Sequence, residues 1–175
     1  MCRYGNMDKG TQAKGDAANR TLRVFRRLSR FPFGKVIYSK LINFYAPYTG
    51  TIRAVVTDLT PGRCTTMMKD RRGIQNHFHT VHAIALCNLC EMTMGIMVDA
   101  TISSNLRWIP RGMTVQYVKK ARGRLSGSSW IDPDLLAPGN RSVPVEIQDM
   151  SGEVVVRAAI ELSISCRPEY KTRVP

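Results

Sequence analysis

The segment at residues 80–101 (TVHAIALCNLCEMTMGIMVDAT) constrains the fold more than any other part of this chain. It is long, it is dominated by Ala, Leu, Met and Ile, and it contains no Pro. Thr80 can serve as the N-cap, and a helix that is apolar on nearly all sides is typically buried. We therefore expect one long helix in the centre of the domain.

Segments with strand character flank this predicted helix on both sides. Before it, residues 51–59 and 63–69 enclose the turn at Pro61-Gly62 and predict a hairpin. After it, strands are expected at 113–119, 123–132, 143–150 and 153–165, with a tight turn at Ser151-Gly152. This order predicts an α+β domain in which an antiparallel sheet is wrapped around a long central helix.

The two ends of the chain differ in composition from this predicted core. Residues 1–18 are small and polar and predict a flexible tail, and 168–175 are expected to form a C-terminal tail. Residues 19–47 predict a helical extension, with an Arg-rich amphipathic helix at 20–30 and a second helix at about 35–45. The Arg-rich helix could dock on acidic lipids, cover an acyl tunnel, or pack against the sheet, which is the simplest expectation.

Composition limits the class of protein. A chain of 175 residues suits one domain, and its net charge of +13 favours a polyanionic partner: nucleic acid, a membrane surface, or a phosphate-rich molecule such as coenzyme A. The five cysteines are an odd number and are expected to be reduced thiols. No apolar run approaches the length of a membrane span, so we predict a cytoplasmic protein, with an organelle matrix as the alternative because the N-terminal segment is Arg-rich.

One strongly ionisable side chain, Glu91, lies within the apolar stretch 83–98. Burying a carboxylate costs several kcal/mol unless it is paired or neutral. A glutamate that reaches solvent or bonds to a neighbouring strand remains an open alternative. The functional interpretation is a desolvated carboxylate suited to act as a base or nucleophile.

The residues just before the helix add a second candidate feature. The first turn of a helix has free N–H groups, and these can stabilise a developing oxyanion together with the side-chain amide of Asn76. His77, His79 and His82, with Cys87 and Cys90, raise the question of a metal site. Their spacing does not match a zinc motif, and the cysteines fall in mid-helix, so we expect no metal and interpret both as core residues.

Four of these residues together resemble a known family. Asn76, then His82-Ala83, then Glu91 nine residues after the histidine, resemble the signature of hotdog-fold thioesterases of the phenylacetate-degradation (PaaI-like) type and a related uncharacterised branch. Ala83 stands where that family usually has glycine. Residues 113–123 (MTVQYVKKARG) also resemble one of its strands. The resemblance covers about residues 48–167, which we expect to form a hotdog thioesterase domain behind the extra N-terminal helices.

The resemblance implies a specific chemistry. Two subunits would form a homodimer, with a dimer of dimers as a further option, and the active sites would lie at the subunit interface. The Ala83 amide and Asn76 of one subunit would polarise the thioester carbonyl of an acyl-CoA, and Glu91 of the other subunit would activate water or attack directly. His82 would support the loop. Coenzyme A would enter as part of the substrate, with no other cofactor, and its phosphates would meet Lys119, Lys120, Arg122 and Arg124.

Two alternatives remain. The same fold could serve as a non-catalytic acyl-CoA-binding module. The charge also suggests nucleic-acid binding, but strands with interleaved aromatics and a helix-turn-helix pattern are missing, so no nucleic-acid partner is expected.

Overall fold

The computed structural model describes residues 19–167, so the predicted tails at 1–18 and 168–175 lie outside the described residues. The helices are α2 (Arg20–Leu28), α3 (Gly34–Tyr45), α4 (Pro47–Gly50) and α5 (Ala83–Thr101), with short 3-10 turns at Arg72–Ile74 and Pro133–Leu135. The strands are β1 (Val55–Thr60), β2 (Arg63–Lys69), β3 (Leu106–Tyr117), β4 (Arg124–Trp130), β5 (Gly139–Asp149) and β6 (Val154–Cys166).

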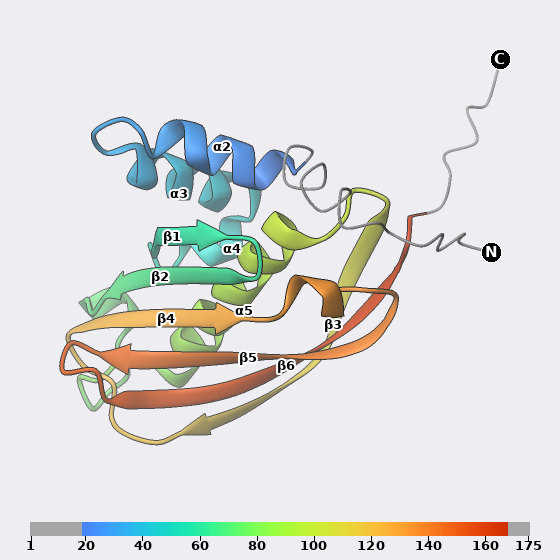
Figure 1. The fold of residues 1–175 in the computed structure, drawn as a ribbon. Coiled ribbons are helices and arrows are strands. Elements are labelled where there is room, and N and C mark those ends of the chain that lie inside the picture. Colours follow the sequence, from blue (N-terminus) through green and yellow to red (C-terminus); the bar gives the residue numbers. More distant parts are fainter. Residues whose placement is uncertain (1–18, 168–175) are drawn as a thin grey trace, which may run out of the picture.

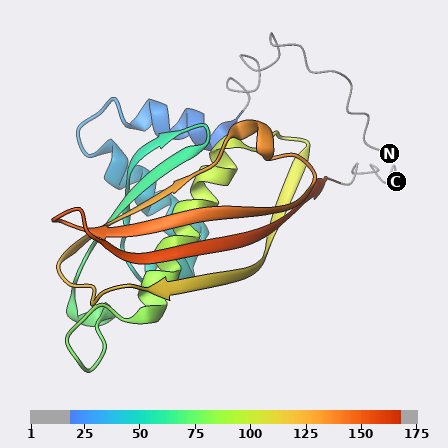
Figure 2. The same ribbon diagram turned by 60° about the horizontal axis from the view of Figure 1, so that its bottom comes forward.

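The strands form one antiparallel sheet in the order β1-β2-β4-β5-β6-β3. The sheet curls around α5, which runs along its concave face (Figures 1 and 2). β1 and β3 are therefore the two edges of the sheet. This arrangement confirms the predicted α+β fold with a sheet wrapped around a central helix.

Helix α5 lies very close to the middle of the sheet. The hydroxyls of Thr93 on α5 and Thr66 on β2 share a buried hydrogen bond of 2.6 Å. A Cβ atom added at Gly127 on β4 would lie 2.9 Å from both of these hydroxyl oxygens and 3.4 Å from Leu89 Cγ. Only a residue without a side chain lets the helix approach β4 this closely, because protein interiors have no spare volume.

The N-terminal extension consists of two packed helices, as predicted. Asn19 caps α2 by accepting a hydrogen bond from Leu22 N at 3.2 Å. Phe25 of α2 packs edge-on against Tyr38 of α3, with ring centroids 5.1 Å apart. Ser39 Oγ accepts a hydrogen bond from the backbone N–H of Val56 at 2.9 Å, which fastens α3 to β1. The two helices form a layer beside β1, at the upper left of Figure 1.

Several predicted boundaries differ from the structure. The N-cap of α5 is His82, not Thr80, because the residues before it form a separate turn that holds Thr80. The first strand begins at Val55 rather than at residue 51, since residues 51–53 form a turn in which Arg53 has a φ of 52°. β3 begins at Leu106, seven residues earlier than predicted.

Two predictions drawn from composition also need correction. The sequence predicts no apolar run of membrane-spanning length, but α5, with 19 residues, is long and apolar enough to cross a membrane. Most of α5 is buried inside the domain, as in the core helix of a globular protein. Cys166 is disulfide-bonded, so the prediction of five reduced thiols is wrong at that position. Cys64, Cys87 and Cys90 are free thiols as expected.

Candidate active site

Two backbone hydrogen bonds hold the end of the loop before α5 to neighbouring segments. Val81 N donates to Ala121 O at 2.9 Å, and His82 N donates to Ile74 O at 2.8 Å. The ring of His82 then turns back, and its Nδ1 accepts a hydrogen bond from Ile84 N at 3.1 Å. His82 therefore has a supporting position as the side-chain cap of α5. The backbone N–H of Ala83, the first helical residue, belongs to the set of first-turn donors that have no acceptor within the helix.

Asn76 organises the turn that leads to this helix start. Its Oδ1 accepts hydrogen bonds from Phe78 N at 2.9 Å and from Thr80 N at 3.2 Å. Its Nδ2 lies 2.9 Å from Thr80 Oγ1 and donates to it. An amide nitrogen carries two hydrogens, so one donor of Asn76 is engaged by Thr80.

An open pocket of about 340 Å³ lies between the start of α5 and the end of β3. Its walls include Asn76, Ala83, Lys119 and Lys120, which brings together four of the predicted site residues. His82 lines a second, smaller pocket of about 200 Å³ instead, with Tyr48 and Asn88.

Tyr117, which sequence analysis did not single out, closes one side of the larger pocket. Its hydroxyl lies 3.1 Å from Cys87 Sγ and 3.5 Å from Ala83 O, so it sits over the first turn of α5. The hydrogen bond with Cys87 and partial burial raise the pKa of Tyr117 to about 12. The signal available in the sequence was its place at the end of an alternating strand directly before the Lys-Lys pair.

Glu91 lies apart from this pocket. It is exposed, on a stripe of α5 that also carries Ile84, Cys87 and Gly95 and that reaches the surface. The expectation that α5 is apolar and buried on nearly all sides is therefore wrong along this stripe, and a single chain does not enclose Glu91. Since Glu91 follows Ala83 by eight residues at 1.5 Å each, the two lie about 12 Å apart along the helix.

The exposed stripe of α5 runs beside the edge strand β3. Trp108 of β3 packs over Gly95, where an added Cβ would lie 3.4 Å from Cη2 of the indole. The indole Nε1 donates to Asp99 Oδ1 at 2.8 Å. Burial raises the pKa of Asp99, and this hydrogen bond opposes the rise.

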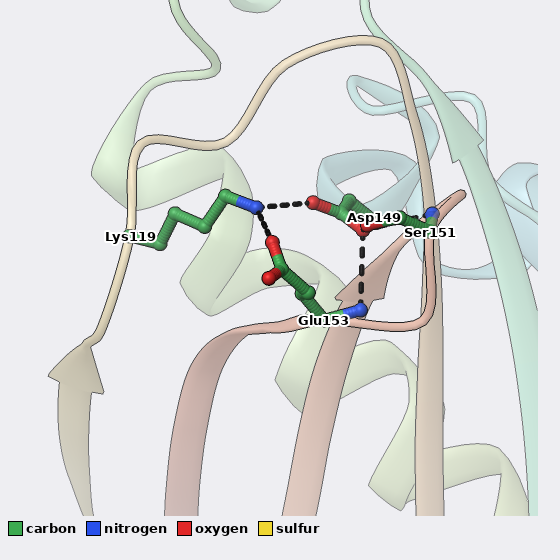
Figure 3. A network of polar contacts seen from close by, with 4 residues as sticks. All are labelled: Lys119, Asp149, Ser151 and Glu153. Atoms are coloured by element: carbon green, nitrogen blue, oxygen red, sulfur yellow. Dashed lines mark hydrogen bonds and ion pairs between the residues drawn. The ribbon is translucent and has the colours of Figure 1, made fainter.

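Lys119 is held by acidic groups of the β5–β6 turn (Figure 3). Its Nζ lies 2.8 Å from Asp149 Oδ2 and also pairs with Glu153. Asp149 Oδ1 in turn accepts hydrogen bonds from Ser151 N at 2.9 Å and Glu153 N at 3.2 Å. The charge of Lys119 is thus already balanced by two carboxylates.

The other predicted phosphate-binding residues remain at the surface. Lys120, Arg122 and Arg124 are all exposed around the turn that joins β3 to β4. Asp70 shapes this turn, since its Oδ2 accepts a hydrogen bond from Gly123 N at 3.1 Å. Within residues 19–167, no three His, Cys, Asp or Glu side chains come close enough to hold a metal ion together.

The sheet curled around one long helix is the hotdog fold, and comparison with solved structures confirms it. A protein described as genomics APC5556 is 36% identical, with a TM-score of 0.75, and the match covers 84% of this chain and 99% of that one. The chain belongs to the family described as Domain of unknown function (DUF4442), which matches residues 34–164. No curated protein matches the chain.

Two further structures share the fold at lower identity. PA5026 from Pseudomonas aeruginosa, described as a protein of unknown function and probable thioesterase, is 20% identical with a TM-score of 0.68, covering 78% of this chain and 97% of that one. The thioesterase HI1161 from Haemophilus influenzae is 10% identical with a TM-score of 0.65, covering 75% and 93%. At these identities the similarity shows the fold alone, and the predicted hotdog fold is confirmed.

Proposed function

We propose that this protein hydrolyses acyl-CoA thioesters at a site formed between two copies of the chain. The observation that carries the proposal is the separation on α5 between the donors at its start and the exposed Glu91. The pocket at the helix start has amide donors, but Glu91 is about 12 Å away along the same helix. A second chain can supply the missing carboxylate.

The edge strand β3 provides a place for that second chain. Among the described strands, β3 pairs only with β6, so its other edge has unpaired backbone groups. Such an edge invites pairing with another chain. Two β3 strands paired there would continue the sheet and set the two α5 helices side by side, with their exposed stripes facing each other.

Two-fold symmetry then fixes which residues meet. If Ala83 of one chain faces Glu91 of the other, the reverse pair forms as well, and the residue midway between them, Cys87, lies at the axis. The thioester carbonyl would accept hydrogen bonds from the Ala83 N–H and the Asn76 amide. Glu91 of the second chain would take a proton from water as the water oxygen attacks the carbonyl carbon. The C–S bond then breaks, and coenzyme A leaves as the thiolate.

The shared fold with the thioesterase HI1161 and with PA5026, described as a probable thioesterase, supports this chemistry. The exposed Lys120, Arg122 and Arg124 would meet the phosphates of coenzyme A, whereas Lys119 is better explained as part of the ion-pair network.

A homodimer is the smallest assembly that completes the site, and a dimer of dimers adds nothing to it. We place the activity in the cytoplasm.

Two substitutions test the two halves of the site separately. Glu91→Gln removes the base. Ala83→Pro removes the backbone donor, and proline is favoured at the first position of a helix. His82 has the extended conformation (φ −65°, ψ 140°) that a residue before proline adopts. We expect Ala83→Pro to fold normally and to lose about 10²–10³ in kcat, measured as free thiol released from a panel of acyl-CoAs.

Mixing the two inactive variants tests whether the site is shared. In a mixed dimer one site combines the intact Ala83 of one chain with the intact Glu91 of the other, and the second site has both defects. Random reassembly should therefore restore about a quarter of the wild-type rate. No recovery in mixed dimers would contradict a shared site. Acyl-CoA binding by an inert wild type would support the binding-module alternative.

A further inference from the structure

The α2–α3 hairpin exposes several large apolar side chains. Phe33 is 80% exposed, Ile37 47%, Leu41 52% and Phe44 86%, and Phe31 in the connecting turn is 64% exposed. At 100° per residue, positions 33, 37, 41 and 44 fall within about 80° of one side of the helix. Tyr38 and Ser39, which pack on α2 and β1, lie outside this sector, at about 140° and 240° from Phe33 on the same scale. We call this set of five residues the hairpin face.

Phe33 has a conformation that the fold alone does not explain. The turn 31–34 is closed by Gly34 N donating to Phe31 O at 3.0 Å, with Pro32 in its second position and Phe33, at a φ of 61°, in its third. Glycine or asparagine is favoured at that position, because a left-handed backbone strains a bulky side chain. Since the ring is also 80% exposed, little packing within the described chain offsets this strain.

The charged residues of the α2–α3 hairpin are all basic. From Arg20 to Gly50 the chain contains no Asp or Glu but seven basic residues: Arg20, Arg23, Arg26, Arg27, Arg30, Lys35 and Lys40. Arg30 directly precedes Phe31, and Lys40 directly precedes Leu41. Exposed aromatic and aliphatic side chains beside Lys and Arg are the pattern of a helix that lies in the interface of an anionic bilayer.

The basic charge of the hairpin also argues against other binding partners for the hairpin face. A second copy of the hairpin brings the same seven basic residues and no Asp or Glu, so two hairpin faces would repel each other. A nucleic acid would satisfy the arginines but would leave Ile37 and Leu41 in water. An anionic bilayer satisfies both, because its headgroups pair with the basic residues while its acyl region takes up the apolar ones.

We propose that the α2–α3 hairpin docks this protein on anionic lipid bilayers through the hairpin face. α3 packs on β1, and β1 and β3 are opposite edges of the sheet, so this surface is separate from the edge assigned to the second chain. The proposal therefore stands whether or not the protein hydrolyses thioesters.

Vesicle binding tests the proposal with matched variants. The full-length protein should sediment with vesicles containing phosphatidylglycerol, less so in high salt, and not with pure phosphatidylcholine vesicles. Phe33→Asn should weaken binding about tenfold by removing the ring. Asparagine tolerates a left-handed backbone, so the same change should leave the thermal stability unchanged or raised. Met150→Asn, in the β5–β6 turn, removes a side chain that is 65% exposed elsewhere and should bind as wild type.

A second pair of variants tests how much the basic residues contribute to vesicle binding. Arg30→Gln should weaken vesicle binding about fivefold, as expected for one basic residue near an anionic surface. Arg157→Gln lowers the net charge equally from strand β6 and should have little effect. The proposal is overturned if anionic vesicles are not bound, if Phe33→Asn and Arg30→Gln bind like their controls, or if these two variants instead change the oligomeric mass in solution.

Discussion

His82 holds the start of α5 through its side chain. Its Nδ1 caps α5 through Ile84 N at 3.1 Å, and the same residue positions the N–H of Ala83. We expect His82→Ala to lower the free energy of unfolding by about 1 kcal/mol, the typical cost of losing an N-cap. His82→Asn keeps a side-chain acceptor and should retain both stability and most of the activity. Urea unfolding and acyl-CoA turnover of both variants check this; an inactive but stable His82→Asn would show that the imidazole has a chemical role.

The sequence predicts the positions of some site residues but not the surroundings of others. Asn76, His82 and Ala83 were assigned to the helix start because their spacing from Glu91 is distinctive, and they do lie there. The exposure of Glu91 agrees with the alternative that the sequence leaves open. The sequence does not decide between the two interpretations, because the apolar stripe beside Glu91 has the same composition as a core-facing surface. The pairing of Lys119 with Asp149 and Glu153 was missed, since those partners lie at least thirty residues away in sequence.

At the scale of the elements, the approach of α5 to β4 depends on Gly127. A Cβ there would lie 2.9 Å from the hydroxyl oxygens of Thr66 and Thr93, whose buried hydrogen bond it would disturb. We expect Gly127→Ala to destabilise the domain by about 1–3 kcal/mol, as overpacking usually does. Gly112→Ala on β3 is the matched control, because an added Cβ there meets no atom within 4 Å. Equal urea midpoints for both variants would contradict the close approach of α5 and β4.

The β5–β6 turn should make part of the stability depend on pH. The hydrogen bond from Lys119, followed by those from Ser151, holds the pKa of Asp149 below its ordinary value of 3.8. A carboxyl whose pKa is depressed in the folded state stabilises that state above the ordinary pKa and loses this contribution as the pH falls. Asp149→Asn should therefore be less stable than wild type at pH 7, and the difference should shrink as the pH falls below 3.8. Urea unfolding at several pH values measures it; a difference independent of pH would contradict the ion pairing.

Most elements can be predicted from periodicity and turn residues, and β3 is the main exception. β2 was predicted with its observed bounds because Gly62 and an alternating pattern define it. β3 was predicted too short because Pro110 interrupts the pattern, and proline is rare inside sheets. As an edge strand, β3 tolerates Pro110, where the register with β6 shifts next to Gly112. Position within a sheet is a tertiary property, and a local pattern does not contain it.

At the scale of the whole molecule, two distinct surfaces lie at opposite edges of one sheet. The β1 edge carries the basic helical hairpin, and the β3 edge carries the exposed stripe of α5. A dimer built through β3 would keep both hairpin faces accessible. Such an arrangement would let one assembly bind a bilayer and act on acyl chains that partition into it.

The geometry of that dimer can be measured without any assay of activity. If Ala83 and Glu91 of two chains face each other, symmetry places the two Cys87 residues beside the axis. Cys87 is half-buried at the edge of the exposed stripe, whereas burial raises the pKa of Cys90 to about 12 and keeps it unreactive. We expect a short bis-maleimide to link two chains through Cys87 in the native protein. Cys87→Ser should abolish this product while leaving the dimer mass unchanged. A dimer that is not cross-linked at Cys87 would show that its two α5 helices meet elsewhere, and Glu91 would then have no neighbouring helix start to serve.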